Sequence, residues 1–147
     1  IRYRMTAAKL PVMKDLSAFL FEGSPINEGL VRSLHDGAFL ANRRNVVLVG
    51  GTGTGKTHLA IAITANVVRA GVRGRFFNLV DLVNRLEDET RRGKAGMLAA
   101  QLSRLDLVVL DELGYLPFAQ SGGQLLFHLI SKLYERTSVI ITTNLSF

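Results

Sequence analysis

The fold is decided by residues 46–57, which read VVLVGGTGTGKT. The first four, Val46–Val49, form an unbroken apolar run rich in valine, which predicts a strand buried on both faces of a parallel sheet. The next eight, Gly50–Thr57, match the phosphate-binding pattern G-x-x-x-x-G-K-[ST]. Apolar residues at helical spacing follow over residues 57–70. The stretch therefore predicts a strand, a glycine-rich loop and a helix whose N-terminus faces a phosphate group.

Each part of the predicted loop has a chemical task. Glycines let successive backbone N–H groups turn toward an anion, because a Cβ would obstruct that curl. Lys56 is expected to reach the β- and γ-phosphates of a nucleotide, and the Thr57 hydroxyl to bind Mg²⁺. The dinucleotide-binding pattern G-x-G-x-x-G is excluded, since Lys56 stands where its third glycine would be. The predicted nucleotide-binding residues are Gly50, Gly51, Thr52, Gly53, Thr54, Gly55, Lys56, Thr57 and His58.

The rest of the chain alternates strands with helices. Further strands are expected at Gly74–Asn78, Leu107–Leu110 and Val139–Thr142, and a helix is expected over residues 97–105. Asn78 is predicted to cap a helix that Gly93 ends, and Ser121 with Gln124 has the spacing of a capping box at the start of another. Ser24-Pro25 is predicted to open a short helix. Such alternation is typical of an α/β fold, with a parallel sheet covered by helices on both faces.

Polar residues follow two of the predicted strands. Asp111 and Glu112 come directly after Leu107–Leu110. One acid at a strand end beside the phosphate loop can hold Mg²⁺, and the next can orient and deprotonate the attacking water. The pair favours ATP hydrolysis over a GTPase, which positions its water with glutamine. Asn144 follows the fourth strand and is expected to orient the same water. The predicted catalytic residues are Glu112, Lys56 and Asn144, and the predicted metal ligands are Thr57 and Asp111.

The amino-acid composition excludes several kinds of chemistry. The chain has 147 residues, of which 48 % are hydrophobic and none is cysteine, which excludes disulfides, thiol catalysis and cysteine-ligated metals. His35, His58 and His128 lack the spacing of metal ligands. No apolar stretch is long enough for a membrane helix, and the first residues lack the charged-then-apolar pattern of a secretory signal, so we expect a soluble cytoplasmic protein.

The formal net charge is +6, and the basic excess lies in residues 1–110. Either a polyanion such as DNA or an ordinary basic surface would explain this excess. Arg136 follows a predicted helix, where a cation complements the helix dipole. The candidate DNA contacts are Arg2, Arg4, Lys9, Lys14, Arg43, Arg44, Arg91, Arg92 and Lys94.

With these features placed, the chain resembles the AAA+ ATPases, and more narrowly the IstB-like helpers of insertion-sequence transposition, which are related to DnaC-type helicase loaders. The similar segments cover nearly the whole chain. They are SPINEGLVRSL at 24–34, the stretch around NVVLVGGTGTGKTHLAIAI from Asn45, VDLVNRLEDETR at 80–91, LDLVVLDELGYLPFAQ at 105–120 and GGQLLFHLISKLYERTSVIITTNLSF at 122–147.

The resemblance implies an ATP-dependent protein that assembles into an AAA+ oligomer on DNA, recruits or activates a transposase and hydrolyses ATP. It implies a Walker A loop at Gly50–Thr57, a Walker B pair at Asp111 and Glu112, and a sensor at Asn144. The alternatives are a helicase loader that uses ATP as a switch and a nucleotide-gated scaffold that does not hydrolyse it.

The resemblance also divides the chain into a basic leading segment, 1–45, and an ATPase core, 46–147. It implies the strand order 1-4-3-2, with a fifth strand, an arginine finger and a lid beyond Phe147. We therefore expect the chain to be partial, and by itself to bind nucleotide weakly and hydrolyse it slowly.

Overall fold

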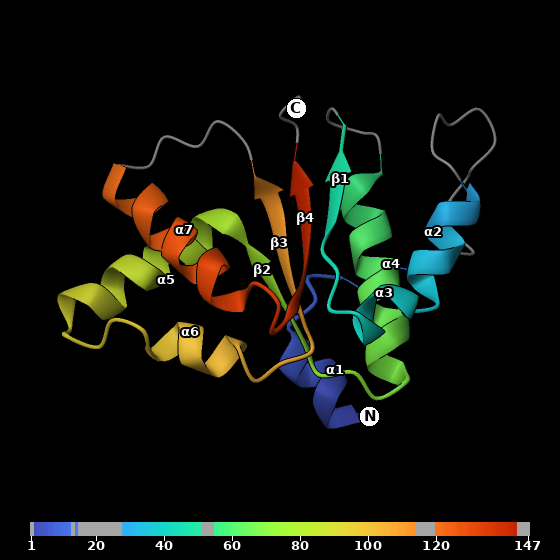
Figure 1. Ribbon diagram of the computed structural model, residues 1–147, viewed down its shortest axis with the longest axis horizontal. Helices are drawn as coiled ribbons and strands as arrows, with labels where there is room; N and C mark the ends of the chain where they lie inside the picture. The colour runs from blue at the N-terminus through green and yellow to red at the C-terminus, as the bar shows by residue number, and fades with distance from the viewer. Residues whose placement is uncertain (1, 13, 15–27, 51–54, 114–119, 144–147) are drawn as a thin grey trace.

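Four parallel strands form one sheet at the centre of the molecule (Figure 1). The computed structural model describes residues 2–12, 14, 28–50, 55–113 and 120–143. The strands are β1 (Val46–Val49), β2 (Gly74–Asn78), β3 (Leu107–Leu113) and β4 (Ser138–Thr143). Their order across the sheet is β1-β4-β3-β2, with every neighbouring pair parallel. The predicted α/β fold and strand order are confirmed.

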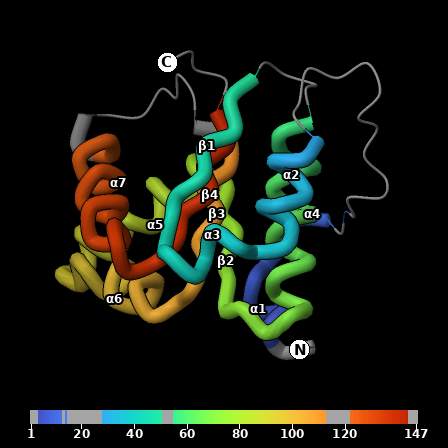
Figure 2. Tube along the Cα trace, turned by 45° about the vertical axis from the view of Figure 1, so that its right-hand side comes forward, coloured from blue at the N-terminus to red at the C-terminus, as the bar shows by residue number. Residues whose placement is uncertain are grey.

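Helices cover the two faces of this sheet in separate groups. Figure 2 shows the sheet between them. One side holds α1 (Arg2–Ala8), α2 (Glu28–His35), α3 (Ala38–Ala41) and α4 (Lys56–Arg69); the other holds α5 (Leu79–Arg91), α6 (Met97–Leu102) and α7 (Gln120–Leu133). No described helix is long and apolar enough to cross a bilayer.

Each face of the sheet has its own hydrophobic core. Leu82 of α5, Leu110 of β3 and Leu129 of α7 belong to one cluster, whereas Ile61 and Ile63 of α4 belong to the other. These side chains are at most 2 % exposed. Burying such a side chain stabilises a fold by about 1.5–3 kcal/mol, so both helical layers hold the sheet in place.

The prediction that Val46–Val49 is buried on both faces is wrong. Val46 and Leu48 are partly buried toward the α4 side, but Val47 is 50 % exposed and Val49 is 52 % exposed. The reason is that β1, at the edge of the described sheet, packs on α4 with one face only, while no residue of β1 joins the hydrophobic cluster formed with α5, α6 and α7. An apolar run predicts a strand, but it does not show whether helices cover both faces of that strand.

The helix boundaries follow the sequence signals at most positions. The Asn78 side-chain oxygen accepts hydrogen bonds from the N–H groups of Val80 and Asp81 at 3.0 and 3.4 Å, which confirms the predicted cap of α5. The predicted cap at Ser121 is wrong, because the chain is already helical at Gln120. The helix predicted over 97–105 ends at Leu102. The predicted helix start at Ser24-Pro25 lies outside the described residues.

Candidate functional site

The N-terminus of α4 and the carboxyl ends of the strands meet at one edge of the sheet, the upper edge in Figure 1. The Gly50 N–H, just after β1, donates to the Thr143 carbonyl of β4 at 3.1 Å. Gly55 precedes α4 with a φ of +87°, a left-handed conformation that glycine adopts at little cost. No acidic side chain lies in the first turn of α4. This helix start is therefore suited to an anion.

A buried carboxylate joins this helix to two strands. The Asp111 side chain lies near the end of β3 and is 5 % exposed. Its Oδ1 accepts a hydrogen bond from the Thr57 hydroxyl of α4 at 3.0 Å and another from the Thr142 hydroxyl of β4 at 2.5 Å. Hydrogen bonds to a charged acceptor are stronger than neutral ones, so the carboxylate is held in one orientation.

An irregularity in β3 turns the next residue away from this buried position. Leu110 pairs with Ile141 and Leu113 with Thr143, so β3 has one extra residue there. Such bulges re-aim side chains beside functional sites. Glu112 sits in the bulge with a φ of +71°, which costs about 1–3 kcal/mol in residues other than glycine. Its N–H donates to the Thr142 hydroxyl oxygen at 2.8 Å, and the residue is exposed.

Asn78 has a second contact that the sequence analysis missed. Its side-chain amide donates to Glu112 Oε2 at 3.3 Å, while its oxygen caps α5. The contact follows from the register of the sheet, in which Asn78 of β2 stands opposite Asp111 of β3. Thr142 was missed for the same reason, because its role depends on which strand lies beside β3. Neither contact is visible in a linear motif.

The structure brings together most of the predicted site. Gly50, Gly55, Thr57 and the pair Asp111–Glu112 lie at one edge of the sheet, with Lys56 and His58 in the first turn of α4. The predicted loop residues 51–54 and Asn144 lie outside the described residues. Asp111 and Glu112 lie within the last three residues of β3 rather than after it, because the strand runs on to Leu113.

The oxygen atoms at this edge fit Mg²⁺ bound to a nucleotide. Mg²⁺ is usually held by one or two carboxylates together with phosphate oxygens and water, rather than by a complete protein cage. Thr57 and Asp111 offer a hydroxyl and a carboxylate 3.0 Å apart beside the helix start. The described residues contain no group of three or more His, Cys, Asp or Glu side chains that could hold a metal ion.

The candidate DNA contacts are not gathered at one place. Arg4 of α1 donates to the Gly71 carbonyl, whereas Arg91 and Arg92 pair with Asp88 at 3.5 and 3.1 Å near the end of α5. Arg43 and Arg44 precede β1. Lys9, Lys14 and Lys94 are exposed.

Comparison with known protein families shows which family the chain belongs to. The family described as "IstB-like ATP binding protein" matches residues 1–147. The chain belongs to this family. A related ATP-binding protein of insertion sequence IS21 from Pseudomonas aeruginosa is 39 % identical over 145 residues, 98 % of this chain and 55 % of the relative. A related protein from Sinorhizobium fredii is 36 % identical, over 100 % of this chain and 50 % of the relative. The chain spans about half the length of these curated relatives.

Solved structures place the IstB-like chain among AAA+ phosphate-loop domains. A crystal structure of the DnaC helicase loader matches with a TM-score of 0.75 and 26 % identity, covering 100 % of this chain and 81 % of that one. AMPPCP-bound DnaA from Aquifex aeolicus matches with a TM-score of 0.74 and 22 % identity, over 93 % of this chain and 44 % of DnaA. The DnaA likeness shows the fold alone. The family resemblance noted in the sequence is thus confirmed.

Proposed function

We propose that the protein is an ATPase that assists DNA transposition. It would bind ATP with Mg²⁺, assemble as an AAA+ oligomer on DNA, recruit or activate a transposase, and hydrolyse ATP, acting in the cytoplasm. The observation that carries the ATPase part is the hydrogen-bonded chain from Thr57 through Asp111 and Thr142 to the Glu112 N–H, beside the start of α4. The names of the curated relatives support the link to insertion sequences and hence to a transposase.

The proposed chemistry assigns one task to each residue at this edge. The N–H groups of residues 51–57 and the Lys56 ammonium would hold the phosphates. Thr57 and Asp111 would hold Mg²⁺, which supplies positive charge to the phosphate oxygens when bound. Glu112 would accept the proton of the attacking water, and Asn144 would orient that water. His58 would line the nucleotide from the first turn of α4.

The division of labour between the two acids follows from their surroundings. Asp111 is buried and held by two threonine hydroxyls, as a metal ligand with a fixed position requires. Glu112 is exposed and is held at one oxygen by Asn78, so its carboxylate can meet water. We therefore assign metal binding to Asp111 and proton transfer to Glu112.

A substitution of Glu112 tests the proposed hydrolysis in the full protein. Glu112→Gln keeps the size and an acceptor oxygen but removes the basic group. We expect phosphate release to fall by about 10²–10⁴-fold, with ATP affinity retained. The control is Glu87→Gln in α5, which removes the same charge elsewhere and should leave turnover unchanged. Equal turnover in Glu112→Gln and the parent would favour the non-hydrolysing scaffold instead.

A helicase loader is the second candidate, because the DnaC helicase loader matches the full length of the chain. The two functions differ in their protein partner. Affinity of the full protein for the transposase of the same insertion sequence, measured with ATP present, would support the transposition role. Binding to a replicative helicase ring with no affinity for that transposase would support the loader.

A further inference from the structure

The edge of the sheet opposite the nucleotide site is rich in arginine. The three residues before each strand, at 43–45, 71–73, 104–106 and 135–137, contain five arginines and only two acids. All four strands are parallel, so these segments meet at one edge, the lower edge in Figure 1. We call these residues the strand-start arginines: Arg43, Arg44, Arg73, Arg104 and Arg136.

Contacts between neighbouring segments hold the starts of the four strands in a row. The Arg43 guanidinium donates to the Arg136 carbonyl at 3.1 Å, which joins the starts of β1 and β4. The Ser138 N–H donates to the Asp106 carbonyl at 3.1 Å, which joins β4 and β3. The Arg73 N–H donates to Asp106 Oδ2 at 3.0 Å, which joins β3 and β2. With strands about 4.8 Å apart, the row spans roughly 14 Å.

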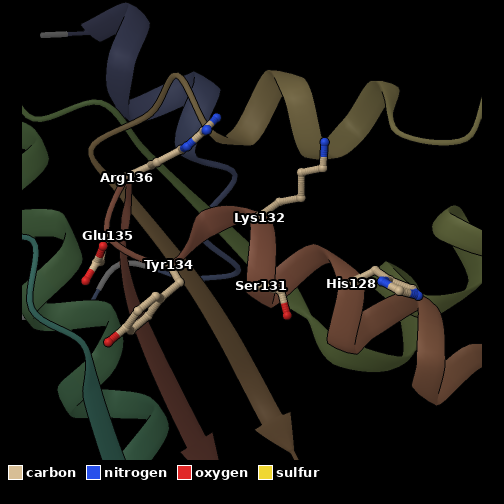
Figure 3. A pocket seen from close by; sticks show the side chains of 6 residues that line it. All are labelled: His128, Ser131, Lys132, Tyr134, Glu135 and Arg136. Atoms are coloured by element: carbon tan, nitrogen blue, oxygen red, sulfur yellow. The ribbon is translucent and has the colours of Figure 1, made fainter.

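Most of the positive charge in this row is not neutralised by the protein. All five arginines are exposed. Of the two acids, Asp106 is paired with Arg73 at 3.2 Å. The Glu135 carboxylate points away from the Arg136 guanidinium in Figure 3. Within the described part of the chain, Arg73 is the one strand-start arginine with a carboxylate within 4.0 Å. Arg43 contacts the Arg136 carbonyl, and the charges of Arg44, Arg104 and Arg136 are open to an outside anion.

An open depression extends the basic row along the end of α7. It has a volume of about 690 Å³ and is lined by His128, Ser131, Lys132, Tyr134, Glu135 and Arg136. Figure 3 shows the Lys132 ammonium and the Arg136 guanidinium on the same side of the chain. Lys132 therefore adds a further cation beside the start of β4.

The shape of this charge fits an extended polyanion. A single small anion needs donors that converge on one point, whereas these cations form a line along the sheet edge. Duplex DNA has one phosphate per strand every 3.4 Å along its axis, so a row of roughly 14 Å runs beside about four base pairs. Guanidinium groups bind phosphate in a two-pronged geometry, which makes arginine well suited to this contact.

We propose that the strand-start arginines, with Lys132, form a surface that binds the phosphate backbone of DNA. This inference rests on the DNA binding of the proposed function and assigns it to one surface. The surface lies at the opposite edge of the sheet from Thr57 and Asp111, so DNA and nucleotide would be held at the same time. It contacts phosphates only, so it contributes affinity without sequence preference.

The test neutralises three of the four strand-start arginines that have no described carboxylate partner. It leaves Arg43 in place, because its guanidinium joins the start of β1 to that of β4. The triple variant Arg44→Gln, Arg104→Gln, Arg136→Gln is made in the full protein. The matched control is Arg91→Gln, Arg92→Gln, Lys94→Gln, which removes the same charge at the outer end of α5. Affinity for a fluorescent random-sequence duplex of about 30 base pairs is measured between about 50 and 200 mM salt. ATP affinity and the thermal unfolding midpoint report on folding.

We expect the test variant to bind the duplex at least tenfold more weakly than the parent. The slope of log affinity against log salt should become shallower by about 0.9 for each lost phosphate contact, or about 2.7 in all. ATP affinity should not change. If the test variant keeps the affinity and salt slope of the parent, this surface does not bind DNA, although the protein does. An equal loss of affinity in the control variant would also contradict the assignment of DNA binding to this surface. A parent protein that binds no DNA would overturn the DNA part of the proposed function as well.

Discussion

At the scale of single residues, the site depends on threonine and asparagine side chains that link the acids to their neighbours. Thr142 donates to Asp111 and accepts from the Glu112 N–H, so one buried hydroxyl sets the position of both acids. Asn78 holds the Glu112 carboxylate from the adjacent strand. The strained backbone at Glu112 is offset by these contacts, because the N–H that the bulge exposes finds a partner.

Replacing Asn78 separates its two roles. In Asn78→Asp the carboxylate still caps α5, since aspartate is as good an N-cap as asparagine. It cannot donate to Glu112, however, and its charge repels the Glu112 carboxylate. We expect the free energy of unfolding to stay within about 0.5 kcal/mol of the parent while ATP turnover falls at least fivefold.

Two measurements on the full protein check this expectation: urea unfolding and steady-state phosphate release. Asn78→Ala is the companion variant, which should lose about 1 kcal/mol because the cap is gone. Parent-like turnover in Asn78→Asp would contradict the assignment of Asn78 as a residue that positions Glu112.

At the scale of elements, the sequence predicted strands and helices well because each carries a local signal. The strand Gly74–Asn78 has the predicted bounds, and Asn78 caps α5 as its side chain predicted. The exposure of Val47 and Val49 could not be predicted from the apolar run, because it depends on what lies beside β1. The helix α1 has no strong periodic signal, and its packing on α4 and β2 is a tertiary effect.

The exposed face of β1 leads to a prediction about aggregation of this 147-residue chain. Val47→Lys puts a charge on an apolar edge strand, which discourages pairing with another chain. Because Val47 is half exposed, we expect the free energy of unfolding of the chain to change by no more than about 0.5 kcal/mol. Light scattering by the variant on heating should be lower than that of the parent. Val80→Lys, at a similarly exposed valine on α5, should leave scattering near the parent level. Equal effects of the two variants would mean that the β1 edge is not the aggregation site.

The ion pair between Arg73 and Asp106, at the starts of β2 and β3, predicts that the stability of the fold depends on pH. Burial alone would raise the pKa of Asp106, but hydrogen bonds and charge from Arg73, with a smaller effect of Arg4, lower the pKa overall. A lowered pKa in the folded state stabilises the protein above the ordinary carboxyl pKa of about 3.9, and this stability is lost as the pH falls through the folded pKa.

Asp106→Asn should therefore be less stable than the parent near pH 7, with a difference that shrinks below about pH 4. Urea unfolding of the parent and of Asp106→Asn at several pH values measures this difference in stability. The effect is small, because the Arg73–Asp106 pair is exposed to solvent. A stability difference that stays constant down to about pH 2 would show that the aspartate acts by its shape and not by its charge.

At the scale of the whole molecule, the parallel sheet separates two kinds of chemistry. Its carboxyl edge joins the buried Asp111 to the start of α4, and its amino edge holds the exposed strand-start arginines. The phosphate loop motif and the acids after Leu110 located the first edge from sequence alone. Of the arginine row, only Arg43 and Arg44 were among the candidate DNA contacts. The other three were not predicted, because the members lie far apart in the sequence and meet only through the strand order.

The central claim is that Thr57 and Asp111 hold Mg²⁺ beside a nucleotide at the start of α4. Calorimetric titration of the full protein with ATP, with and without Mg²⁺, tests it in the parent and in Asp111→Asn. We predict that Mg²⁺ tightens ATP binding in the parent at least tenfold, and that Asp111→Asn loses this gain while keeping its Mg²⁺-free affinity. An undiminished gain in Asp111→Asn, or a parent that binds no ATP, would contradict the account.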